Sequence, residues 1–255
     1  VSKGETLLDT AKNLEAMGID IVIIRHGAAG APKFISTNIN ACVVNAGDGY
    51  CEHPTQALLD LYTIVDAFNG VDNLKIAMVG DLRYGRTVHS LSKLLCLFER
   101  VQVTLVSPGE LRMPGEIVEE MRQSGIDVIE SDAMEASISH VDIVYSTRIQ
   151  EERFSSQAEA DLYRGRYRLN QAIYTHHCEP NTVIMHPLPR DSRAQAQELD
   201  DDLNENPNLA IFRQTDNGVL VRMALFALVL DIADQVHSHA RPVTWYTARR
   251  FARPT

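Results

Sequence analysis

Positive charge is scarce in this sequence. Its 255 residues include 24 lysines and arginines against 34 aspartates and glutamates, so the formal net charge is −10. Proteins that bind nucleic acid or anionic membranes present a basic surface to the phosphates, and the charge balance therefore argues against both kinds of partner. A small anionic substrate is still compatible with it, because a few arginines in one cleft reverse the local electric field.

Cysteine is also scarce and is irregularly spaced. Cys42, Cys51, Cys96 and Cys178 form no CxxC pair, which argues against a disulfide framework or a four-cysteine zinc site. The run 176–178 (His-His-Cys) is a poor metal site, because adjacent side chains rarely converge on one ion. We therefore expect no bound metal and a reducing compartment, the cytoplasm.

The sequence shows no long apolar run and no secretory signal. The most apolar stretch, 219–230, is interrupted by Arg222 and is shorter than the roughly 20 residues that a membrane-spanning helix needs. Apolar residues make up 45% and charged residues 23%, which is an ordinary globular composition. The length fits one or two domains with a sizeable core.

Strand-like and helix-like segments alternate along the chain. Expected strands are 19–24, 41–44, 75–79, 101–106, 128–129, 141–145, 182–185 and 210–212. Expected helices are 7–14, 58–68, 88–98, 114–123 and a closing helix, 217–236, whose middle is apolar on nearly all sides. The alternation predicts an α/β protein with doubly wound parallel sheets, and the closing helix is expected to be buried across domains.

Arginines follow most of the expected strands that end in polar loops. After these strands come Arg25, then His53 and Gln56 behind the glycine-rich turn 45–49, then Arg86, Arg148 and Arg190. Strand ends converge at one edge of a parallel sheet, where ligands bind. Arginine grips carboxylates and phosphates with two parallel hydrogen bonds, so the joint pattern predicts a cleft for a polyanion. Taken singly, each residue is better explained as an ion pair, a cap or a turn.

The segment 80–86 begins a helix, and helix N-termini favour anions. It matches neither the GxGxxG fingerprint nor a P-loop, and the chain contains no GxSxG nucleophile motif. We therefore expect no nucleotide and no other cofactor.

A set of short motifs, taken together, resembles the aspartate carbamoyltransferase family. The motifs are Ser-Lys-Gly-Glu-Thr-Leu at 2–7, Ile-Arg-His at 24–26, Asn-Ala-Gly-Asp-Gly at 45–49, His-Pro-Thr-Gln at 53–56, Gly-Asp-Leu-Arg-Tyr-Gly-Arg-Thr-Val-His-Ser at 80–90, Thr-Arg-Ile-Gln at 147–150 and His-Pro-Leu-Pro-Arg at 186–190. They occur in the family's order and at similar intervals over nearly the whole chain. Each motif alone is weak, but the combination is specific.

The resemblance implies the carbamoyltransferase fold, with two doubly wound parallel-sheet domains, and a metal-free, cofactor-free reaction. The α-amine of L-aspartate attacks the carbonyl carbon of carbamoyl phosphate and phosphate leaves, giving N-carbamoyl-L-aspartate for pyrimidine biosynthesis. Such a site must hold two anions together and stabilise a tetrahedral oxyanion, and fixed cationic and hydrogen-bonding groups serve both purposes.

The resemblance also implies a role for each matching residue. Arg25 binds the phosphate and the carbonyl oxygen, and His53 donates to that same oxygen. Gln56 holds the carbamoyl amide, together with the backbone carbonyls of Pro187 and Leu188. The implied carbamoyl-phosphate site is completed by Ser2 and Lys3, and the implied catalytic residues are Arg25, His53 and Lys3.

On the aspartate side, Arg86 and Arg148 grip the two carboxylates. Thr87 assists and Gln150 orients the substrate, and Leu188 and Lys3 also belong to this set. Arg190 is assigned to holding either its own loop or the substrate. The resemblance shows no side-chain base for the amine, so the departing phosphate is expected to take the proton.

In the family, the loop that contains Ser2 and Lys3 reaches into the site of a neighbouring subunit, which implies a homotrimer with shared active sites. The implied division assigns 1–68 and 218–255 to a carbamoyl-phosphate-binding domain and 69–217 to an aspartate-binding domain. The resemblance leaves open whether a regulatory chain or a dihydroorotase binds this trimer.

One family feature is missing from the sequence. Family members carry a Ser-Thr-Arg-Thr-Arg phosphate-binding segment upstream of the Lys-Gly-Glu-Thr loop, and this chain contains no such run. The first domain is therefore expected to be incomplete, and a polypeptide of only these residues to be poorly active or inactive.

Two alternative functions compete with this one. An ornithine carbamoyltransferase would need an acid for the cationic side chain, whereas Arg148, Gln150 and the 186–190 loop favour aspartate. A non-catalytic subunit of a pyrimidine-pathway complex is supported by the missing segment. It is opposed by the set of Arg25, His53, Arg86 and Arg148. The arginine-rich tail after Ser238 is expected to be solvated.

Overall fold

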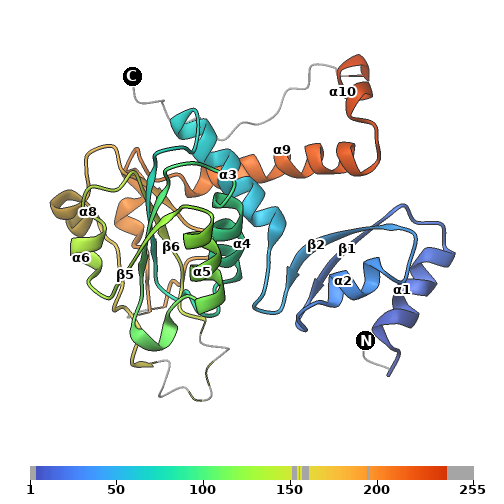
Figure 1. Ribbon diagram of the computed structural model, residues 1–255, viewed down its shortest axis with the longest axis horizontal. Helices are drawn as coiled ribbons and strands as arrows, with labels where there is room; N and C mark the ends of the chain where they lie inside the picture. The colour runs from blue at the N-terminus through green and yellow to red at the C-terminus, as the bar shows by residue number, and fades with distance from the viewer. Residues whose placement is uncertain (1–3, 151–153, 155, 157–160, 194–195, 240–255) are drawn as a thin grey trace.

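The computed structural model describes residues 4–150, 154, 156, 161–193 and 196–239 (Figure 1). The predicted site residues Ser2 and Lys3 lie outside the described residues, and so does the arginine-rich tail from residue 240 onward.

The N-terminal part forms a small α/β layer. Strands β1 (Ile21–His26) and β2 (Cys42–Asp48) pair in parallel, and helices α1 (Leu7–Ala16) and α2 (Ala31–Ser36) pack with them around a small apolar core. The α1 N-terminus is capped by Thr6, whose hydroxyl accepts from the backbone N–H of Asp9. The predicted turn at 45–49 is placed too early in the sequence, because strand β2 continues to Asp48.

The larger layer is a five-stranded parallel sheet in the order β5-β4-β3-β6-β7. Its strands are β3 (Lys75–Val79), β4 (Gln102–Val106), β5 (Asp127–Ser131), β6 (Ile143–Ser146) and β7 (Val183–Met185). Within this sheet the chain enters at β3, continues outward through β4 and β5, and then returns to the other side of β3 to form β6 and β7. The switch point between β3 and β6 is where such sheets leave a crevice for ligands.

Helices cover both faces of this sheet, which confirms the predicted doubly wound class. Figure 1 shows α4 (Arg86–Leu95) and α5 (Gly115–Gln123) on one side, with α3 (Pro54–Phe68), and α6 (Met134–Ser137) and α8 (Gln171–His177) on the other. Each face has its own apolar core. The short helices α2, α6 and α8 were not expected, since a turn or two carries too little periodicity to be read from sequence.

Helices α3 and α9 (Ile211–Val229) pack together and connect the two layers. The expected strand 210–212 is wrong: Ala210 is the N-cap of α9. The expected closing helix is two helices, because the chain turns at 230–232 before α10 (Ala233–His239). The described helices include none that is both long and apolar enough to cross a bilayer.

The expectation that the closing helix is buried is also wrong for its second half. Gln214, Asn217 and Gly218 are buried near its start, whereas Leu220 is 54% and Leu228 67% exposed. In Figure 1 this half of α9 runs beyond α3 toward the β1–β2 layer. Its apolar residues point in all directions, and several of those beyond the start of the helix remain exposed.

Candidate active site

The polar loops after β3 and β6 meet at the switch point of the large sheet. Asp81, fully buried after β3, accepts hydrogen bonds from the backbone N–H groups of Tyr84 (2.9 Å) and Gln150 (3.2 Å). Gly80 has φ +117°, and a side chain there would collide with the carbonyl of Thr147. This close approach fixes the backbone that carries Arg148 and Gln150, and the Gln150 side chain donates to the Tyr84 carbonyl (2.6 Å).

Arg86 extends from the start of α4 to the end of β2, so it joins the two layers. Its Nη1 donates to the carbonyl of Gly49 at 3.2 Å. A Cβ added to Gly47 would lie 2.8 Å from the Arg86 Cζ, and Gly47 itself has φ +117°. The glycines of the 45–49 segment therefore leave room for the guanidinium, which glycine alone permits at this backbone angle.

His89 and Lys93, further along α4, strengthen this connection. The two ring nitrogens of His89 lie 3.1 Å from the carbonyl oxygen of Tyr50 and 2.8 Å from that of Leu82. Lys93 pairs with Glu52 at 2.7 Å. The start of α4 is thus held to the loop between β2 and α3 at several points.

His53 occupies the N-cap position of α3, and its ring makes no capping bond. Its backbone N–H donates to Ser90 Oγ (2.9 Å), and the Thr55 hydroxyl lies 3.3 Å from Nδ1. Burial, followed by the charges of Arg86, Arg25 and Arg222, lowers the pKa of His53 to about 4. The ring is therefore neutral at physiological pH, and a Thr55 hydroxyl that donates to Nδ1 leaves the proton on Nε2 as a hydrogen-bond donor.

Three arginines from three elements thus act on one neutral imidazole through their charges. Arg25 lies on β1, Arg86 on α4 and Arg222 on α9. In the sequence, Arg222 stands out only as an interruption of the apolar run 219–230. That interruption was the available signal, because a charged residue within an apolar run calls for a polar role.

We expect the pKa of His53 to give the stability a characteristic pH dependence. In the unfolded chain the imidazole binds a proton near pH 6.5, but in the folded protein only near pH 4. The unfolded state binds more protons between these values, so stability rises with pH across this window and is lost on acidification, by at most about 3 kcal/mol. Urea unfolding from pH 4 to 7.5 measures it.

His53→Gln is the matched comparison for this prediction, because glutamine does not titrate. Other titrating groups contribute equally to both proteins and cancel in the difference between their unfolding free energies. The difference should change between pH 4 and 6.5 and be constant above pH 7. A constant difference over the whole range would contradict the assigned burial of the imidazole.

The loop 186–190 follows β7 and is firmly anchored. His186 is buried, with Nδ1 accepting from the Leu188 N–H (2.8 Å) and Nε2 lying 2.8 Å from Glu198 Oε1. Leu188 adopts φ +55°. Arg190 is 3.3 Å from Asp201 and donates to the carbonyl of Asp200, an arrangement that supports the loop-holding part of its assignment.

The structure groups the described site residues into three sets. His53 and Arg86 are both tied to α4, which carries Arg86 and the Ser90 hydroxyl that accepts from the His53 N–H, and the charges of Arg86 and Arg25 lower the His53 pKa. Thr87 lies beside Tyr145 of β6, the strand that leads to Arg148 and Gln150. Gln56 connects to the 186–190 loop through the buried side chains of Asp60 and Gln214, the second of which accepts from the His186 N–H.

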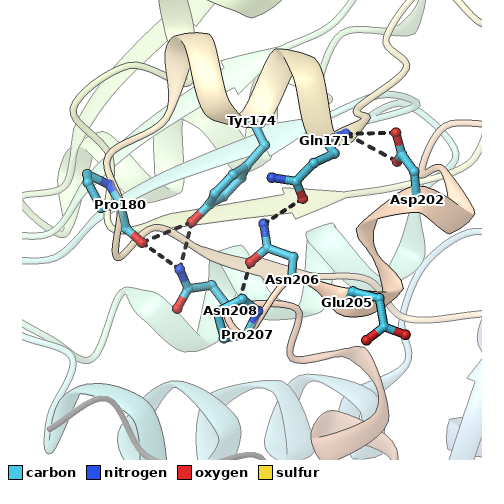
Figure 2. Close-up of a pocket in the computed structure, with 8 residues that line it drawn as sticks. All are labelled: Gln171, Tyr174, Pro180, Asp202, Glu205, Asn206, Pro207 and Asn208. Carbon is cyan, nitrogen blue, oxygen red and sulfur yellow. Dashed lines mark hydrogen bonds between the residues drawn. The ribbon is translucent and has the colours of Figure 1, made fainter.

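The surface pocket shown in Figure 2 lies elsewhere, between α8 and the segment 202–208, and contains none of the predicted site residues. Its polar groups bond to one another: Asn206 to Gln171 (3.1 Å), and Asn208 to Tyr174 (2.8 Å). A second hollow, lined by 132–136 and 165–168, also lies apart from the site. Within the described ranges no three His, Cys, Asp or Glu side chains are grouped as metal ligands.

Comparisons with known proteins bear on the whole chain. Residues 72–229 match the family described as aspartate/ornithine carbamoyltransferase, Asp/Orn binding domain, and residues 1–66 match its carbamoyl-P binding domain. The chain is 63% identical to the aspartate carbamoyltransferase catalytic subunit of Cellvibrio japonicus over 254 residues, which are 98% of this chain and 75% of the relative.

Solved structures of the Trypanosoma cruzi aspartate transcarbamoylase are similar to this chain. The complex with N-(phosphonacetyl)-L-aspartic acid has a TM-score of 0.80 at 35% identity, covering 88% of this chain and 70% of that one. The complex with carbamoyl phosphate and aspartate has a TM-score of 0.80 at 36% identity, covering 88% and 71%.

Proposed function

This chain belongs to the aspartate/ornithine carbamoyltransferase family, and we propose how its site residues divide the work of the reaction. The chain transfers the carbamoyl group of carbamoyl phosphate to the α-amine of L-aspartate, giving N-carbamoyl-L-aspartate and phosphate, an early step of pyrimidine biosynthesis. The observation that carries the proposal is that α4 brings the Arg86 guanidinium to the carbonyl of Gly49 and holds the backbone of His53 through Ser90, with further positive charge from Arg25 and Arg222 acting on His53.

On the carbamoyl-phosphate side, Arg25 binds the phosphate, and His53 donates its ring N–H to the carbonyl oxygen. A neutral imidazole donor stabilises the charge that develops on this oxygen as the amine attacks. Gln56 presents its amide to the carbamoyl group, with the backbone carbonyls of Pro187 and Leu188 beside it. Ser2 and Lys3 complete this side from a neighbouring subunit.

On the aspartate side, Arg86 and Arg148 bind the carboxylates, with Thr87 and Gln150 placing the substrate beside them. Leu188 and Lys3 also contribute. Two guanidinium groups held by different elements, α4 and the loop after β6, fix a dicarboxylate in one orientation, so its amine meets the carbonyl carbon. With pKa about 4, His53 is a weak base, which supports transfer of the amine proton to the departing phosphate.

The proposed assembly follows from the shared site. Residues 1–68 and 218–255 form the carbamoyl-phosphate-binding domain and 69–217 the aspartate-binding domain, and three chains form a homotrimer. A regulatory chain or a dihydroorotase is a further candidate partner. The free state of all the cysteines supports a cytoplasmic location.

The substrate assignment is tested by comparing two acceptors. The protein is expressed from its own gene in a host without aspartate carbamoyltransferase activity, and phosphate release is measured with L-aspartate and with L-ornithine. Arg86 and Arg148 repel the cationic side chain of ornithine, so we expect kcat/KM to favour aspartate by at least about a thousandfold. Equal rates, or a preference for ornithine, would refute the proposed aspartate site.

A further inference from the structure

A buried carboxylate lies beneath the site, at Asp60. It belongs to α3, one helical turn after Gln56, and its side chain is 0% exposed. It accepts hydrogen bonds from Gln56 Nε2 (2.8 Å), Gln214 Nε2 (2.5 Å) and the Tyr145 hydroxyl (2.7 Å). Within the described part of the chain Asp60 forms no ion pair, and burial raises the pKa of its carboxyl to about 6.

An ionised carboxylate can only accept hydrogen bonds. Each glutamine that bonds Asp60 must therefore turn its NH₂ inward and its carbonyl oxygen outward. Gln214 shows this orientation, because its outward Oε1 accepts the backbone N–H of His186 at 3.0 Å. The same constraint on Gln56 leaves its Oε1 as the end that faces away from Asp60.

We propose that Asp60 is a positioning residue that fixes which end of the Gln56 amide faces the substrate. The inference rests on the proposed role of Gln56 toward carbamoyl phosphate. A carbonyl oxygen held at this point accepts from the NH₂ of a carbamoyl group and finds no donor in an acetyl group. Asp60 thereby contributes to the choice of the group that is transferred.

The same carboxylate connects the other parts of the site. Through Gln214 of α9 it reaches the backbone of His186, where the 186–190 loop begins. Through Tyr145 of β6 it reaches Thr87. Gln56, the loop and the aspartate-side residue Thr87 are therefore positioned by one buried group, and all three partners of Asp60 share its orientation constraint.

The test compares carbamoyl phosphate with acetyl phosphate, in which a methyl group replaces the NH₂. With either donor the aspartate amine attacks the carbonyl carbon, the bond to the phosphate oxygen breaks and phosphate is released. In Asp60→Ala the Gln56 amide is free to turn over. We expect kcat/KM for carbamoyl phosphate to fall about 10- to 100-fold while that for acetyl phosphate changes by less than about threefold.

Two further variants separate positioning from general damage. In Asp60→Asn, Oδ1 can still accept from both glutamines while Nδ2 donates to the Tyr145 oxygen, so we expect the ratio of the two kcat/KM values to stay near that of the parent. Thr63→Val removes a buried hydrogen bond with Asn217 at the same α3–α9 contact. This variant should change kcat/KM for carbamoyl phosphate and for acetyl phosphate by the same factor. If Asp60→Ala does not fold, Asp60→Ser, which keeps a hydroxyl in the space, takes its place.

If Asp60→Ala lowers kcat/KM for carbamoyl phosphate and acetyl phosphate by the same factor, or lowers neither, the ratio of the two values is unchanged and the inference is overturned. An Asp60→Asn variant that behaves like Asp60→Ala would overturn it as well. The outcome is distinct from failure of the proposed function, because the parent protein's turnover of carbamoyl phosphate and aspartate is measured in the same experiment.

Discussion

Replacing Arg148 with alanine is expected to lower kcat/KM for aspartate on the order of a thousandfold. A guanidinium that binds a carboxylate with two charge-assisted hydrogen bonds contributes roughly 3–6 kcal/mol to holding the substrate. Arg148 follows β6 at the switch point and is half-buried there. Its Nη1 donates to the Ile149 carbonyl at 3.5 Å.

Initial rates at varied aspartate concentration measure this effect, and thermal unfolding shows whether the fold survives. Arg100→Ala is the matched control, because the Arg100 side chain is 66% exposed at the opposite end of the sheet, where it bonds Glu99 and Asn73. The control should keep its activity. Unchanged aspartate turnover in Arg148→Ala would remove this residue from the site.

Replacing His53 with alanine is expected to lower kcat about 100- to 1,000-fold, the cost of one lost donor to a developing oxyanion. KM for aspartate should change much less, because the imidazole serves the carbonyl oxygen and not the carboxylates. The His53 side chain makes no capping bond to α3, so its removal leaves the helix start intact. Steady-state kinetics with both substrates varied separates kcat from KM.

His140→Ala is the control for this variant, since His140 is 82% exposed and pairs with Glu179. It should have the parent's kcat. If His53→Ala instead raised KM for aspartate and left kcat unchanged, His53 would be a binding residue for the second substrate, and the oxyanion role would be wrong.

The sequence predicted the parts of the fold where pattern and burial coincide. The range 75–79 is a strand with the predicted bounds, because a short apolar run between polar ends has one good solution in a parallel sheet. The β2 end was mispredicted because glycine usually marks a turn, whereas Gly47 remains in the strand and leaves space for Arg86. That requirement comes from a residue 39 positions away and is invisible locally.

Only part of the candidate site could be predicted from the sequence. The strand-end pattern singled out Arg25, Arg86 and Arg148, but the contributions of Arg222 and Asp60 depend on the packing of α9 against α3. An aspartate on an amphipathic helix is normally assigned to the solvent face. Only the fold shows that Asp60 is surrounded by three donors from α3, α9 and β6.

The most direct test of the account is a crystal structure of the protein with N-(phosphonacetyl)-L-aspartate, which joins a phosphonate to aspartate and so spans both halves of the proposed site. We predict that Arg86 and Arg148 hold its carboxylates, that Arg25 contacts the phosphonate and that His53 donates to the carbonyl oxygen. A ligand seated elsewhere, such as the pocket between α8 and 202–208, would contradict the account. So would a ligand whose carboxylates contact neither Arg86 nor Arg148.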